Sequence, residues 1–143
     1  MGHANILVDS CFWIALYTPE EIDGHERALS LIEDLENNEI LVPWPTLYEF
    51  VNTRLARRKD YLFAFEQFLL KPNVQKISDE IYKNAALQNV FELNISRTAS
   101  ISLVDEVLRL MILDENLKVD FLVTFNRKDF EYPCQLSNVT ILE

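Results

Sequence analysis

The sequence predicts an α/β fold: a three-layer α/β/α arrangement in which a mostly parallel sheet of four or five short strands is flanked by helices. Short, fully apolar runs alternate along the chain with segments whose apolar residues recur at helical spacing. The 143 residues are 49% hydrophobic, which is enough to bury a sizeable core. We therefore expect one domain over residues 1–143, in which residues 1–3 have the character of an expression scar.

Five apolar runs are the expected strands, and helices are expected between them. The strands cover residues 6–8, 40–42, 74–77, 121–124 and 139–142. The helices are expected directly after Asp9, over 28–35, from Thr46 onward, over 61–70, over 79–91 with Ser78 as the cap, and from Ser102 to about Glu115.

Composition restricts the location and the ligands of this chain. No run of eighteen apolar residues occurs, and the start lacks the order of a secretory signal, so we expect no membrane segment. Cys11 and Cys134 lack the spacing of metal ligands and do not form a disulfide framework, which favours the cytoplasm.

The net charge of −10 opposes nucleic-acid binding in bulk, because phosphate contacts depend on lysine and arginine. Two local groups of basic residues soften this argument. The first group is Arg54, Arg57, Arg58 and Lys59, and the second is Arg127 and Lys128. These residues are candidate RNA contacts, although solvated helix ends explain them equally well.

Three acids map to one edge of the expected sheet and are candidates for one site. Asp9 ends the first strand, whereas Glu49 and Asp105 are expected in the first turns of later helices. Strand ends and helix starts gather at one edge of a parallel sheet, where such folds place ligands. Taken singly, Glu49 and Asp105 fit the third position of capping boxes that begin at Thr46 and Ser102. Together they predict a hard divalent ion such as magnesium or manganese.

Four segments resemble the motifs of the PIN-domain family, and within it the VapC-like toxin ribonucleases of toxin-antitoxin pairs. They are ILVDSCFWIAL at 6–16, VPWPTLYEFV at 42–51, SLVD at 102–105 and FLVTFNRKDF at 121–130. The resemblance covers the whole chain. It implies a Mg²⁺- or Mn²⁺-dependent endoribonuclease that hydrolyses RNA phosphodiesters through a metal-activated water.

The resemblance also implies roles for particular residues. Asp9, Glu49 and Asp105 would hold the metal, and Asn126 occupies a fourth position at which many members have aspartate. The uncharged amide of Asn126 favours one metal over two, and Asp129 is a possible substitute carboxylate from the same turn.

Two hydroxyl residues are candidates for orienting a water or a carboxylate. Ser10 and Thr124 could act in this way, but a helix cap and a strand-end hydroxyl are simpler interpretations. His25 has no evident partner and is expected to be solvated. Trp13, Trp44 and the aromatic stripe at 61–68 could contact bases or a protein, although aromatics at helical spacing usually face a core or a dimer interface.

The resemblance further implies an antitoxin that inserts a cationic segment into the acidic cleft, and a homodimer. Two other functions stay open. The first is a PIN-like module that binds RNA or protein without cutting, which the uncharged Asn126 favours. The second is a receiver-type signalling domain, which fits poorly because Asp9 is followed by Ser10 rather than by a second acid.

Overall fold

The computed structural model describes residues 3–96 and 100–143 and confirms the predicted α/β class. Five strands form one sheet in the order β3-β2-β1-β4-β5, and every neighbouring pair is parallel. The strands are β1 (Asn5–Val8), β2 (Glu39–Pro43), β3 (Val74–Ile77), β4 (Phe121–Val123) and β5 (Thr140–Leu142). This order differs from the 2-1-3-4-5 order of receiver domains, which removes the receiver hypothesis.

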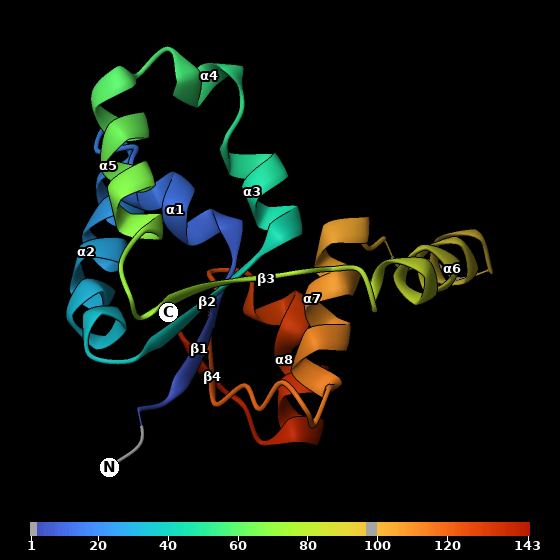
Figure 1. Cartoon of the computed structure of the whole chain (residues 1–143). Coiled ribbons are helices and arrows are strands. Elements are labelled where there is room, and N and C mark those ends of the chain that lie inside the picture. Colours follow the sequence, from blue (N-terminus) through green and yellow to red (C-terminus); the bar gives the residue numbers. More distant parts are fainter. Residues whose placement is uncertain (1–2, 97–99) are drawn as a thin grey trace.

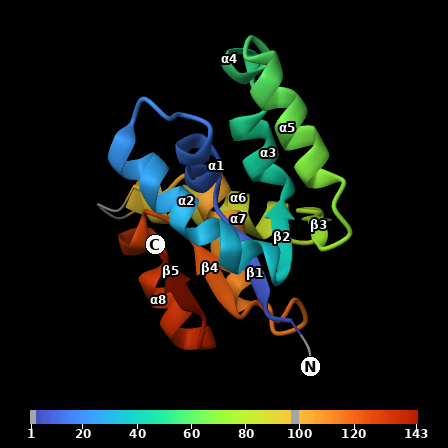
Figure 2. The same cartoon turned by 90° about the vertical axis from the view of Figure 1, so that its left-hand side faces the viewer.

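Eight helices lie in the described part of the chain. They are α1 (Ser10–Leu16), α2 (Ile22–Glu36), α3 (Trp44–Phe50), α4 (Thr53–Ala56), α5 (Lys59–Leu69), α6 (Lys83–Ser96), α7 (Leu103–Leu113) and α8 (Arg127–Ser137). Figures 1 and 2 show the sheet between two groups of helices, with α1, α2 and α5 on one side and α7 and α8 on the other. None of the described helices is long and apolar enough to cross a membrane.

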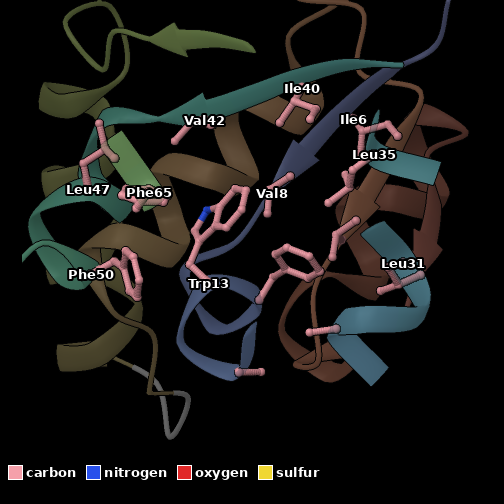
Figure 3. Packing of buried hydrophobic residues seen from close by; sticks show 14 of the residues in the cluster. Ile6, Val8, Trp13, Leu31, Leu35, Ile40, Val42, Leu47, Phe50 and Phe65 are labelled. Carbon is pink, nitrogen blue, oxygen red and sulfur yellow. The ribbon is translucent and has the colours of Figure 1, made fainter. Parts of the chain in front are cut away.

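Alternation along the strands produces two separate cores, one on each face of the sheet. Ile6 and Val8 of β1 face the helices α1, α2, α3 and α5, whereas Leu7 between them faces α7 and α8. Trp13 lies at the centre of the first core and is 1% exposed (Figure 3). Its ring centroid lies 5.3 Å from that of Phe65.

The aromatic stripe at 61–68 is part of this first core. Phe65 is buried, and Phe68 and Tyr61 are partly buried against the same cluster. Phe63 points the other way and is 62% exposed. The core interpretation of the stripe is confirmed.

Several boundaries differ from the sequence expectation. The helix after β2 begins at Trp44 instead of Thr46, because Pro45 sits at the start of the helix, where a missing N–H costs nothing. Asp79 to Tyr82 form a turn stabilised by the Asp79 carbonyl, so α6 begins only at Lys83. Ser78 Oγ accepts from the N–H of Glu80 and caps this turn rather than a helix.

Helices α4 and α8 were not expected. Pro133 lies inside α8 and obscures the helical pattern, although Phe130, Pro133 and Cys134 are buried at the spacing of one helix face. Three residues separate β4 from α8, and the start of α8 fixes the positions of its N-cap Asn126 and of Asp129 in its first turn.

Candidate active site

Asp9 is the most firmly held acid at the carboxyl edge of the sheet. It directly follows β1, caps α1, and is 3% exposed. Its Oδ1 accepts from the N–H of Ser10 at 2.7 Å, and its Oδ2 accepts from Thr124 Oγ at 3.0 Å. Burial nevertheless raises the pKa of Asp9, because desolvation of the carboxylate outweighs these hydrogen bonds.

Thr124 connects Asp9 to the turn after β4. Its side chain is fully buried, donates to Asp9 and accepts from the backbone N–H of Asn126 at 3.0 Å. The hydroxyl therefore links the end of β1 to the beginning of α8. The sequence had left open whether Thr124 was only a strand-end hydroxyl, and the structure places it in direct contact with Asp9.

Glu49 reaches the same edge through Ser10. Ser10 Oγ donates to Glu49 Oε1 at 2.7 Å, so the side chain of Ser10 bridges the start of α1 and the exposed Glu49 of α3. The predicted capping box is wrong here: Thr46 lies inside α3 and donates to the Pro43 carbonyl at 2.6 Å. Glu49 is in the last turn of α3, where the helix dipole does not favour a negative charge.

Asp105 lies in the first turn of α7, as predicted. Ser102 caps this helix, and its Oγ accepts from the N–H of Asp105 at 3.1 Å. Burial, followed by the negative charges of Asp9, Asp129 and Glu49, raises the pKa of Asp105 to about 6. Asp105 therefore lies within electrostatic range of three other acids at this edge of the sheet.

Asn126 and Asp129 both lie at the start of α8, and they differ in burial and charge. Asn126 is exposed and sits at the start of α8, and its side chain makes no capping hydrogen bond. Asp129, one turn further on, is partly buried and acts electrostatically on Asp105. The fourth carboxylate of the cluster is therefore Asp129.

Cys11 is a contact that the sequence did not reveal. Its Sγ lies 3.4 Å from Asp9 Oδ2 and 3.7 Å from Thr124 Oγ, and accepts from the N–H of Phe125 at 3.4 Å. Its position two residues after Asp9, on the first turn of α1, was the only available indication. Both cysteines are free thiols.

The basic residues lie in two places and differ in their accessibility. Arg54, Arg57 and Lys59 are exposed where α4 meets α5, at the tip seen in Figure 1. Arg58 has a structural role, because it bonds to the Tyr17 carbonyl and Glu20 and lies 4.3 Å over the Tyr61 ring. Arg127 pairs with Glu143 at 2.9 Å, and Lys128 is exposed. His25 is also engaged, because its Nδ1 lies 3.2 Å from the carbonyl of Ala15.

The donor chemistry of the cluster fits a hard divalent cation. Within residues 3–96 and 100–143, no three acidic, histidine or cysteine side chains are already arranged as a metal-binding group. The four acids supply only oxygen, and the charges of Asp9, Asp129 and Glu49 add to burial in raising the pKa of Asp105. Magnesium retains several waters when bound, so carboxylates that are spread apart can hold it partly through water.

This fold and this edge define a class of protein, a three-layer α/β domain with acidic residues at the carboxyl ends of parallel strands. The chain has the fold of a chain in the crystal structure of VapBC2 from Rickettsia felis, which was bound to a DNA fragment from the promoter. The match has a TM-score of 0.56 and 16% sequence identity over 96% of each chain. No protein-family model and no curated protein matches. The likeness confirms the predicted fold.

Proposed function

We propose that this chain is a Mg²⁺- or Mn²⁺-dependent endoribonuclease, and that it is the toxin of a toxin-antitoxin pair. One observation carries the proposal: Asp9, Glu49, Asp105 and Asp129 share one edge of the sheet, where burial and then the charges of the other three acids raise the pKa of Asp105 to about 6. A protein gains no stability from crowding carboxylates, so such an arrangement is typical of a functional site. The shared fold with a chain of VapBC2 supports the toxin assignment.

A bound divalent ion would neutralise charge on the scissile phosphate and acidify a water molecule. The side chains of Asp9, Asp105 and Asp129 would hold the ion, with Glu49 as a ligand directly or through water. Asn126 stays a candidate for orienting that water, because it begins the same helix as Asp129.

The hydroxyl residues hold the carboxylates in position for this chemistry. Thr124 and the N–H of Ser10 fix both oxygens of Asp9, so this carboxylate cannot turn away from the edge. Ser10 Oγ occupies one oxygen of Glu49 and leaves the other oxygen free to bind a cation or a water. Fixed ligands of this kind reduce the reorganisation that the reaction requires.

The test is cleavage of single-stranded RNA by the purified protein with magnesium, with manganese and with EDTA. We expect products only with a divalent ion, and we expect Asp9→Asn to abolish them. Asp60→Asn is the matched control, because Asp60 is an exposed acid of α5 outside the cluster. Cleavage that persists in Asp9→Asn, or in EDTA, would remove the proposal.

Asp129→Asn and Asn126→Ala separate the two candidates at the fourth position. We expect Asp129→Asn to cause the greater loss of cleavage, because Asp129, unlike Asn126, contributes negative charge to Asp105. An equal or greater loss in Asn126→Ala would return the role to the amide.

A module that binds RNA or protein without cutting is the second candidate. It is favoured by the lack of a ready-made three-residue metal group in the described part of the chain. It predicts RNA binding without products at every magnesium or manganese concentration.

The antitoxin and the homodimer are part of this proposal. The VapBC2 neighbour is a toxin-antitoxin complex, and an uncompensated acidic edge suits a cationic segment such as an arginine. A small adjacent reading frame whose product copurifies with the chain and blocks cleavage would support the pairing. Measurement of molecular mass in solution tests the homodimer.

A further inference from the structure

An apolar hollow adjoins the acidic cluster. It has a volume of about 270 Å³ and lies between α3, the turn before α6 and the first turns of α7. Figure 1 shows α3 beside the start of α7, at the end of β3. Val104 and Val107 form part of its apolar wall, Tyr48 and Lys83 line it, and Glu49 is shared with the cluster. The hollow therefore opens next to the position where a scissile phosphate would be held.

Tyr48 of α3 lines this hollow, and Trp44 lies beside Tyr48, one helical turn before it. Tyr48 is 74% exposed and Trp44 is 38% exposed, and their ring centroids lie 6.1 Å apart. Lys76 Nζ lies 5.6 Å from the centre of the Trp44 ring. Exposed aromatic faces next to lysines are the common means by which proteins bind single-stranded nucleic acid.

Charge at the hollow differs from that of the chain as a whole. The residues that line the hollow include one cation, Lys83, and two acids, Glu49 and Asp79, whereas the whole chain carries −10. The pair between Lys83 and Glu80, at 3.0 Å, is exposed and contributes little, so Lys83 can turn toward a phosphate at low cost. The hollow thus offers a phosphate one cation, Lys83, beside its apolar wall.

We propose that this hollow binds one base of single-stranded RNA, stacked on Tyr48, beside the phosphate at the acidic edge. The proposal rests on the ribonuclease function proposed above. A volume of about 270 Å³ is slightly below the roughly 300–1,000 Å³ of sites that enclose drug-sized ligands, which suits a single planar group. Stacking on Tyr48 selects single-stranded over double-stranded RNA, because paired bases present no free face.

The test measures binding apart from cleavage. All proteins carry Asp9→Asn to prevent cutting, and the probe is a short fluorescein-labelled oligouridylate whose anisotropy is followed in magnesium buffer. Tyr48→Ala should weaken binding roughly 5- to 150-fold, which corresponds to a stacking contact of about 1–3 kcal/mol. Tyr48→Phe should bind like the parent, because phenylalanine keeps the ring. Tyr132→Ala is the matched control, since Tyr132 is 66% exposed on α8.

A second probe isolates the base. The same oligonucleotide with abasic positions should bind more weakly, and Tyr48→Ala should cause no further loss with it. Unchanged oligouridylate binding in Tyr48→Ala overturns the subsite. The subsite is also overturned if Tyr48→Ala leaves the affinity for RNA unaltered but changes the molecular mass in solution or the binding of the antitoxin. That result would assign the hollow to a protein partner.

Failure of the subsite and failure of the ribonuclease proposal give different results. If the chain with Asp9 intact cuts RNA and Tyr48→Ala binds normally, only the subsite is wrong. If the same chain cuts no RNA but binding depends on Tyr48, only the nuclease proposal is wrong. If neither cleavage nor binding occurs, both fail.

Discussion

Thr124→Val tests the central geometry of the site without any assumption about function. Valine has nearly the same shape as threonine, so the substitution removes the hydroxyl and leaves the packing intact. Asp9 Oδ2 then loses its donor at 3.0 Å in a position where the carboxyl group is 3% exposed. Only the weaker Cys11 thiol, at 3.4 Å, stays within reach.

The loss of stability in Thr124→Val follows from the charge on Asp9. A hydrogen bond to a buried charged group contributes about 1.5–3 kcal/mol to the free energy of unfolding. For a chain of this length that corresponds to a fall in melting temperature of roughly 3–12 °C. The N–H of Asn126 also loses its acceptor, in a hydrogen bond that is only partly buried.

The loss of stability in Thr124→Val should be greater at neutral pH than at acid pH. Thr124 stabilises the ionised form of Asp9, and Thr124→Val therefore raises the pKa of Asp9 further above its ordinary value. The destabilisation should be largest when Asp9 is ionised and should shrink as the pH falls and Asp9 takes up a proton in both proteins. Chemical denaturation at neutral and at acid pH measures both values.

Two further variants complete the test. Thr124→Ser keeps the hydroxyl and should retain most of the stability, and Thr124→Val should cost less in an Asp9→Asn background, where the charge is absent. A loss below about 0.5 kcal/mol at neutral pH, the usual range for surface substitutions, would refute the contact. A loss that is identical with and without Asp9 would refute the charge argument.

Three further predictions concern other parts of the site and the core. In EDTA, Asp105→Asn should raise the melting temperature at neutral pH. This gain should disappear as the pH falls through about 6, because the wild-type carboxyl then becomes protonated. A higher melting temperature that persists in acid would contradict this prediction. Ser10→Ala frees Glu49, and it should slow RNA cleavage roughly 10- to 100-fold, an effect typical of residues that orient metal ligands; Ser30→Ala, an exposed serine of α2, should leave the rate unchanged. Phe65→Ala should cost about 3–5 kcal/mol in denaturant unfolding, whereas Phe63→Ala on the exposed face of α5 should change stability by less than about 0.5 kcal/mol.

The order of the strands and helices could be predicted from the local pattern of apolar residues, because strands and helices bury their apolar faces at fixed periods. The residues of β3 were predicted without error, and Asp9 and Asp105 were placed correctly at the starts of α1 and α7. A buried parallel strand needs a continuous apolar run, and the acid that follows it is conspicuous in the sequence.

The start of α3 and the existence of α8 depended on context instead. Pro45 and Pro133 are compatible with helices in this fold, but in the sequence alone a proline indicates the end of an element. As a result Glu49 moved from the first turn of α3 to its last, and Asp129 moved from a loop to the first turn of a helix.

The sequence by itself determined the fold class and the candidate acids, because both depend on residue types and on short-range spacing. Only the tertiary structure decided that the charge of Asp129 acts on Asp105, and that Ser10 and Thr124 bond to Glu49 and Asp9. These contacts join residues 39 and 115 positions apart. Residues this far apart in the sequence are brought together by the strand order and by packing on both faces of the sheet. No local sequence pattern encodes either of these.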